Sequence, residues 1–199
     1  MNVLNNMDFV RVGPQCSGFN PKIERSLDRI RWIVIHYTGC NGSAHEVARS
    51  LSRANSRAST HFICDEYAAI NTLPLTRIAW HISDAKPQSI YSRWPGGYVH
   101  ALGLSLHRRG CSNAASIGVD VCTRNVGTKF APVWELLGVK HAVKLVASLM
   151  NDLSISPEMV VRHFDVTGKP CPWPWAEDCT GWLEFKRLLS EETFDAEQR

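Results

Sequence analysis

The stretch WIVIHYT, residues 32–38, joins four consecutive apolar residues to a histidine and two hydroxyl-bearing residues. A short apolar run rich in β-branched residues is typical of a strand that is covered on both faces of a sheet. His36 follows this run directly. We therefore expect a buried strand that ends at His36, where the imidazole can leave the core.

Strand and helix patterns alternate along the rest of the chain. A helix over residues 43–56 is predicted by apolar residues at helical spacing and by a capping box formed by Ser43 and Glu46. The remaining patterns predict strands over residues 60–64, 68–73, 117–122 and 159–162, and helices over residues 133–153 and from Thr180 onward. This alternation predicts an α/β fold with a central mixed β-sheet flanked by helices.

The length of 199 residues suits one domain with short extensions. Residues 1–30 contain several turn-forming residues and are interpreted as a lead-in segment. The domain is expected over residues 31–190, followed by an acidic tail over 191–199 that frays. The stretch 82–116 is rich in Gly, Ser, Pro and aromatic residues, which is typical of a long loop that forms a wall or lid of a site.

Composition and charge exclude several classes of protein. The net charge of +3 is too small to indicate a nucleic-acid partner. No apolar run approaches the ~18 residues that a membrane span needs, so membrane insertion is not expected. The first residues, MNVLNNMDFVRVG, lack a basic start followed by an apolar stretch. We therefore expect synthesis in a cytoplasm without a signal peptide.

The cysteine pattern argues against two common kinds of cysteine site. The seven cysteines form no CxxC pair, so zinc fingers and thioredoxin-like redox sites are not expected. In a reducing cytoplasm most of these cysteines would remain thiols.

Three residues have the chemistry of a catalytic metal site. His36 and His163 each follow an apolar run, and Cys171 comes eight residues after His163. Two imidazoles and a thiolate are suitable zinc ligands, and three protein ligands leave a fourth position open for water. Taken alone, however, a histidine after an apolar strand is more often a hydrogen-bonded structural residue, and a lone cysteine such as Cys171 is usually a small buried apolar residue.

Five segments in a fixed order favour the metal site. The segments WIVIHYT, STHFICDE, IAWH, SIGVD and RHFDVTGKPCPWPW together resemble the zinc-dependent N-acetylmuramoyl-L-alanine amidases of the type-2 family. That family includes phage lysozyme-like amidases and the peptidoglycan recognition proteins. The resemblance covers about residues 30–190, and its most specific part is H-x-x-x-x-x-K-x-C-P from His163 to Pro172. It implies the type-2 amidase fold.

The resemblance also implies roles for individual residues. His36, His163 and Cys171 match the family's ligands for Zn²⁺, and Lys169 matches a catalytic lysine of phage-type members. Asp120 falls where many members carry a glutamate that acts as general base. Because aspartate is one methylene shorter, its contact with the attacking water could need a bridging water. Without the family, Asp120 could be a capping or ion-pairing carboxylate and Lys169 a solvated loop residue.

Further residues are expected to contact substrate. Thr60, next to His61, falls where some phage members carry a catalytic tyrosine, so that role is missing or changed in this chain. His81 resembles a cleft histidine of the family.

The aromatic residues near the expected metal have two possible roles. Trp173 lies close to Cys171 in the sequence, and Trp94 and Tyr98 lie in the long loop. They could form apolar walls on which sugars and peptide stems lie. The alternative is that Trp173 and Trp175 close the core beneath the last helix.

The resemblance implies a peptidoglycan hydrolase that cleaves the amide between N-acetylmuramic acid and the L-alanine of the stem peptide. Zinc would activate water and polarise the carbonyl, a carboxylate would move the proton, and an ammonium would stabilise the oxyanion. We expect a phage or prophage endolysin that is made in the host cytoplasm and reaches the cell wall with the help of a holin. Two alternatives are a cytoplasmic amidase that trims recycled muropeptides and a non-catalytic peptidoglycan-binding module. In this superfamily the binding-only members lack the cysteine ligand, so Cys171 favours an enzyme.

Overall fold

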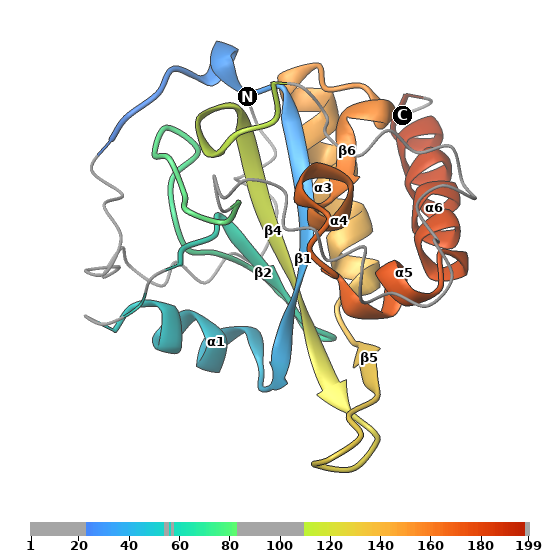
Figure 1. Cartoon of the computed structure of the whole chain (residues 1–199). Helices are drawn as coiled ribbons and strands as arrows, with labels where there is room; N and C mark the ends of the chain where they lie inside the picture. Colours follow the sequence, from blue (N-terminus) through green and yellow to red (C-terminus); the bar gives the residue numbers. More distant parts are fainter. Residues whose placement is uncertain (1–22, 54–55, 57, 83–109, 198–199) are drawn as a thin grey trace.

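The computed structural model describes residues 23–53, 56, 58–82 and 110–197. In this part of the chain, six strands form a mixed sheet in the order β3-β2-β4-β1-β6, with β5 paired to β4 (Figure 1). The strands are β1 (Trp32–Asn41), β2 (Phe62–Cys64), β3 (Ala69–Asn71), β4 (Ser116–Asn125), β5 (Trp134–Leu136) and β6 (Val160–Arg162). β1, β2, β4 and β6 run parallel, whereas β3 and β5 are antiparallel to their neighbours. The expected central mixed sheet is confirmed.

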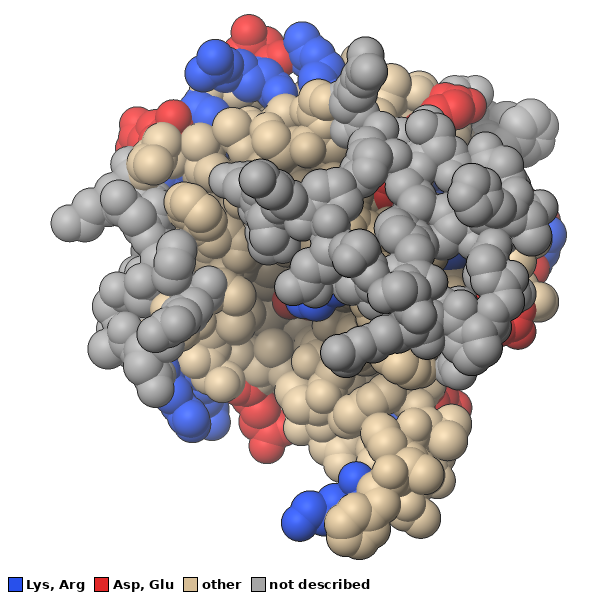
Figure 2. Space-filling model, in the orientation of Figure 1, with Lys and Arg blue, Asp and Glu red and all other residues tan. Residues whose placement is uncertain are grey.

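Helices lie on both faces of this sheet. They are α1 (Ala44–Leu51), α3 (Val139–Leu153), α4 (His163–Thr167), α5 (Trp173–Glu177) and α6 (Thr180–Glu197). α3 lies behind the sheet in Figure 1, and α1 and α4 lie in front of it. The front face is hollowed near its centre (Figure 2). Within the described residues, every helix is too short or too polar to cross a membrane.

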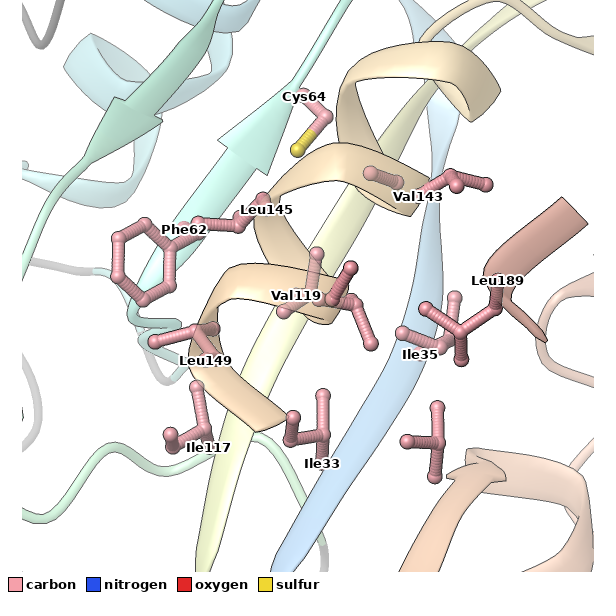
Figure 3. Close-up of a cluster of buried hydrophobic side chains, with 14 of the residues drawn as sticks. Ile33, Ile35, Phe62, Cys64, Ile117, Val119, Val143, Leu145, Leu149 and Leu189 are labelled. Atoms are coloured by element: carbon pink, nitrogen blue, oxygen red, sulfur yellow. The ribbon is translucent and has the colours of Figure 1, made fainter. Parts of the chain in front are cut away.

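The main core lies between the sheet and the helices α3 and α6. Figure 3 shows sheet residues such as Ile33, Ile35 and Val119 pointing toward Leu145 of α3 and Leu189 of α6. Successive side chains of a strand point to opposite faces. The residues between them, at positions 34, 36, 118 and 120, therefore belong to the front face. Both faces are covered, which explains the continuous apolar run that opens β1.

Helix α1 begins as its sequence predicts and ends sooner. The Ser43 hydroxyl accepts the Glu46 N–H, and the Glu46 carboxylate accepts the Ser43 N–H, so the capping box is confirmed. The helix ends at Leu51 and does not continue to Ser56. The Ser52 hydroxyl donates to the Arg49 carbonyl, a local bond that competes with further helical turns.

The predicted helix over residues 133–153 is wrong in its first part. Residues Trp134–Leu136 form β5, which pairs with the end of β4, and α3 begins only at Val139. The W-E-L alternation is a period-two strand signal at the edge of a helical pattern. Gly138 separates the two elements: a Cβ there would lie 2.1 Å from the Cys64 carbonyl oxygen.

Both ends of the domain extend beyond the expected bounds. Arg25 is buried, and its Nη1 donates to the Asn113 carbonyl at 3.0 Å and to the Ser116 carbonyl at 2.7 Å. The segment just before residue 30 is therefore packed into the fold. At the other end, α6 continues past Ser190 to Glu197, over most of the segment that the sequence assigns to an acidic tail.

A buried ion pair fixes the junction between β6 and α4. Arg162 is 1% exposed, and its guanidinium contacts both oxygens of Asp165, with Nη2 2.7 Å from Oδ1 and Nε 3.1 Å from Oδ2. The same guanidinium donates to the Trp175 carbonyl at 2.6 Å. Asp165 Oδ2 also accepts the Arg162 backbone N–H at 2.8 Å. The pair thus holds His163, the first residue of α4, in a fixed place.

This junction gives a stability prediction. Asp165→Ala leaves the Arg162 guanidinium buried without its carboxylate, which should lower the free energy of unfolding by about 3–5 kcal/mol. Equilibrium urea unfolding measures the loss. Glu184→Ala is the matched control, because it breaks another i,i+3 pair, with Arg187, that is more than half exposed. That change should leave the free energy of unfolding nearly unchanged, because water screens an exposed ion pair. Equal losses in the two variants would contradict the structural role of Asp165.

Candidate metal centre and catalytic cleft

His36, His163 and Cys171 meet in the structure, as the sequence predicts. Their ligand atoms all lie within 4.8 Å of one another, and all three residues are buried. β1 pairs in parallel with β6, with Ile35 opposite Arg162, so the residues that follow, His36 and His163, become neighbours. Their ring centroids are 4.8 Å apart. The Cys171 carbonyl accepts the N–H of Phe164 at 2.9 Å, which brings the cysteine back to the start of α4.

The local setting of the two histidines differs from the sequence expectation. Neither histidine ends a strand: His36 lies within β1, which continues to Asn41, and His163 opens α4. The strand continues beyond His36 through Tyr37 and Thr38, which line the cleft and are not part of the apolar core. The sequence did not reveal this continuation, because the apolar pattern stops at His36.

The His163 ring lacks any hydrogen-bond partner among the described residues. Both Nδ1 and Nε2 are buried and make no hydrogen bond. Burial, together with the charge of Lys169, lowers the pKa of His163 to about 3, so the ring stays neutral. A buried polar group without a partner is costly, and a neutral imidazole is a good metal ligand. The donor set therefore fits a metal ion.

The Cys171 thiol completes this donor set. Its Sγ lies 3.7 Å from His36 Nδ1, and the backbone N–H of Tyr37 is directed toward it. Burial raises the pKa of Cys171 to about 12, although the Tyr37 N–H and the charge of Lys169 act in the opposite direction. A bound cation would reverse this balance, because metal coordination deprotonates a thiol.

Two of the three residues, His36 and Cys171, line a cleft of about 430 Å³ on the front face of the sheet (Figure 2). His81, Asp120 and Lys169 line the same cleft, together with residues of α1 and of the segments beside it. Potential ligands, a carboxylate and a cation thus face one space. That combination could bind a polar substrate and move protons.

Asp120 is held beside the donor set by strand pairing. β4 pairs in parallel with β1, with Asp120 opposite His36, so the two side chains share the front face. Burial raises the pKa of Asp120 to about 7, while a hydrogen bond from the Thr60 hydroxyl and the charge of Lys169 act in the opposite direction. The carboxyl group can therefore gain or lose a proton near neutral pH.

Lys169 lies in the turn between α4 and Cys171. It is exposed, and its backbone N–H donates to the Thr167 hydroxyl at 3.3 Å. Its charge lowers the pKa of His36, His163, Asp120 and Cys171. The ammonium is therefore within electrostatic range of the whole donor set.

Thr60 and His61 lie beneath the cleft and are not among its lining residues. Thr60 is 2% exposed and supports Asp120 through the hydrogen bond of its hydroxyl. His61 is fully buried: its Nδ1 accepts the Gly118 N–H at 3.0 Å, and its Nε2 lies 3.0 Å from the Arg77 carbonyl. Both ring nitrogens of His61 are thus engaged within the fold, which contradicts the expectation of a substrate contact.

His81 lies in the cleft and contacts a donor directly. Its Nδ1 is 2.9 Å from His36 Nε2, and its Nε2 is 3.1 Å from Ser116 Oγ. Sequence reasoning missed Ser116 and Gly118. The glycine in SIGVD was a usable signal, because a Cβ at Gly118 would lie 2.7 Å from His81 Cγ.

Of the two roles that the sequence left open for the aromatic residues, the described residues support the core role for Trp175 and do not place Trp173 on the cleft wall. Trp175 is 5% exposed and packs against Trp182 and Phe185, with ring centroids 5.5 and 5.1 Å away, so it belongs to the core. Trp173 is half-buried at the start of α5, outside the residues that line the cleft. Trp94 and Tyr98 fall outside the described residues.

Comparisons with known proteins identify relatives of the chain. A family model described as N-acetylmuramoyl-L-alanine amidase (Amidase_2) matches residues 26–174. The N-acetylmuramoyl-L-alanine amidase BlyA of Bacillus subtilis (strain 168) is 30% identical over 165 residues, which cover 82% of this chain and 42% of BlyA. The chain therefore spans less than half the length of this relative.

Solved structures agree with the match to the amidase family model. The catalytic domain of XlyA superimposes with a TM-score of 0.58 at 26% identity, and the match covers 92% of this chain and 96% of that domain. PlyL superimposes with a TM-score of 0.64 at 23% identity over 89% of this chain and 92% of PlyL, which supports the fold. The family match spans well over half of the chain and includes every strand of the sheet, the donor set and the cleft. The chain belongs to the Amidase_2 family of N-acetylmuramoyl-L-alanine amidases.

Proposed function

We propose that this domain hydrolyses the amide bond between N-acetylmuramic acid and the L-alanine of the stem peptide in peptidoglycan. One observation carries the proposal: in a chain of this amidase family, two imidazoles and a thiol converge within 4.8 Å at a cleft that also holds Asp120 and Lys169. The relative BlyA is named an N-acetylmuramoyl-L-alanine amidase, which supports the same reaction in this chain.

The metal in this proposal is Zn²⁺, held by His36, His163 and Cys171. Two nitrogen donors and one sulfur donor are typical of catalytic zinc sites, which keep one position open. The two ring nitrogens of His163 have no hydrogen-bond partner, which favours the binding of a metal ion by this ring. When bound, zinc supplies Lewis acidity that makes water a better nucleophile and polarises the scissile carbonyl.

Asp120 is the proposed general base. Its carboxylate takes a proton from the attacking water while the water oxygen bonds to the carbonyl carbon. When the C–N bond breaks, the same proton passes to the departing amine of L-alanine. A hydrogen bond from the Thr60 hydroxyl lowers the pKa of Asp120 and so favours its charged, proton-accepting form.

Lys169 is the proposed electrostatic partner of the reaction. The tetrahedral intermediate carries a negative oxygen, and an ammonium on the cleft wall stabilises that charge. Lys169 lies on the short turn between two proposed ligands, so the backbone that positions His163 and Cys171 also positions this cation.

The biological setting in this proposal is lysis by a phage or prophage. The domain would be made in the host cytoplasm, reach the cell wall with the help of a holin, and bind peptidoglycan as its macromolecular partner. Digestion of intact sacculi separates this setting from the trimming of recycled muropeptides, which requires activity on small fragments alone.

The zinc proposal predicts the metal content of the purified protein. The wild type should hold about one zinc per chain, and His36→Ala, His163→Ala and Cys171→Ala should each lower both zinc content and activity. Elemental analysis after gel filtration measures the metal. His141→Ala is a suitable control, because that histidine bonds the Asp65 carbonyl away from the cleft. Full zinc occupancy in all three ligand variants would contradict the assignment.

The proton-transfer proposal separates the use of the metal from its binding. Asp120→Asn and Lys169→Ala should keep zinc and fold, yet each should lose on the order of 10²-fold or more in turnover. Asp152→Asn and Lys140→Ala are matched controls on the exposed side of α3 and should keep full activity. Nearly full activity of the Asp120 variant would assign the base to another group, and loss of zinc would assign Asp120 a structural role.

The proposed bond predicts the chemical nature of the products. Digested sacculi should release stem peptides with new amino termini, and the glycan strands should stay long. Mass spectrometry of the released fragments identifies the ends. New reducing sugar ends without new amines would indicate a glycosidase. Binding to sacculi without any release would indicate a non-catalytic module.

A further inference from the structure

We propose that His81 and Ser116 fix the proton of His36 on Nε2 and thereby leave His36 Nδ1 as the atom that binds the metal. This inference rests on the proposed function, because it gives the zinc site its donor atom. It assigns His81 the role of a positioning residue, in place of the substrate contact that the sequence suggests.

The hydrogen bonds form a series from His36 through His81 to Ser116, and their direction is set by the last one, between Ser116 and the Ser112 carbonyl. Ser116 Oγ lies 2.6 Å from the Ser112 carbonyl oxygen, which can only accept. The single hydroxyl proton of Ser116 is therefore used in that bond. Ser116 Oγ is left as an acceptor for the next group, His81 Nε2, at 3.1 Å.

The same donor and acceptor argument applies to His81. Its Nε2 must carry a proton in order to donate to Ser116. The two ring nitrogens of His81 face His36 and the Ser116 hydroxyl, neither of which is a carboxylate that would stabilise a charged ring. The ring is therefore neutral and holds one N–H. His81 Nδ1 is therefore an acceptor, and the atom that faces it at 2.9 Å, His36 Nε2, must donate.

The consequence at His36 is a free lone pair on Nδ1. That atom lies on the other side of the ring, 3.7 Å from Cys171 Sγ. Without a cation, the Cys171 S–H can donate to it, so each group in the series donates to the next. Metal ligands of the imidazole type commonly donate their second N–H to a partner that sets the ring orientation. The fold provides that partner before any metal binds.

Two further features hold His81 in this arrangement. Gly118 lies directly beneath the ring: a Cβ there would be 2.9 Å from His81 Nδ1, closer than side chains normally approach. The buried Asn113 side chain accepts the backbone N–H groups of His81 and Ile82, at 3.1 and 2.8 Å. Arg25 in turn anchors the segment that carries Asn113 and Ser116.

The first test reads the proton position directly, on metal-free protein. Long-range ¹H–¹⁵N NMR correlations of the imidazole rings distinguish a proton on Nδ1 from one on Nε2. We expect His36 and His81 both to be neutral and protonated on Nε2. A proton on His36 Nδ1 would overturn the inference. Because no zinc is present, this result is independent of whether the proposed function holds.

The second test uses two amides that replace different ends of the His81 ring. The Asn oxygen of His81→Asn can take the place of Nδ1 and accept from His36, whereas the longer His81→Gln reaches toward Ser116 and leaves His36 without an acceptor. Competition with a chromophoric chelator gives the zinc affinity of each variant. We expect His81→Gln to bind zinc about 10–100-fold more weakly than wild type, and His81→Asn to remain within about threefold.

Controls separate the possible failures. His141→Gln changes a histidine that contacts a carbonyl elsewhere and should bind zinc like wild type. Melting temperatures check that each variant folds. If His81→Gln binds zinc like wild type and only KM for peptidoglycan rises, His81 is a substrate contact and the inference is wrong. If the wild type binds no zinc, the proposed function fails, and the NMR measurement still decides the proton position.

Discussion

The parallel pairing of β1 with both β4 and β6 is the constraint on which the site depends. The first pairing sets Asp120 opposite His36, and the second sets Arg162 opposite Ile35, one residue before the two histidines. A shift of one residue in either pairing would turn a functional side chain to the other face of the sheet. The apolar residues that alternate with these positions pack against α3 and α6, so the core itself maintains the register.

Burial then shifts the pKa values of the acidic and the basic groups of the site in opposite directions. Removal from water disfavours every charged form, so the pKa of Asp120 rises to about 7, that of Cys171 rises to about 12, and that of His163 falls to about 3. The metal-free site is therefore rich in neutral donors and poor in charge. A divalent cation is the natural complement of such a set, because it stabilises the thiolate and uses the free lone pairs of the imidazoles.

Much of this arrangement could be predicted from the sequence, and the failures have physical causes. The five ordered segments led to the fold and to the grouping of His36, His163 and Cys171. His36 and His163 lie on or next to strands with strong apolar patterns, and Cys171 belongs to the same motif as His163. The prediction that a helix begins at residue 133 failed. The backbone at Gly138 lies very close to the Cys64 carbonyl, and the spacing of apolar residues does not reveal such a close approach. His61 was misplaced because a motif gives neighbours in the sequence and not the direction of a side chain.

The central claim is that one zinc ion binds between two imidazoles and one thiolate. X-ray absorption at the zinc edge of the purified protein tests it most directly, because it reports the kind and distance of the bound atoms. The account predicts one sulfur at about 2.3 Å and two imidazole nitrogens at about 2.0–2.1 Å, with one further light atom. A shell of oxygen and nitrogen atoms without sulfur would contradict it.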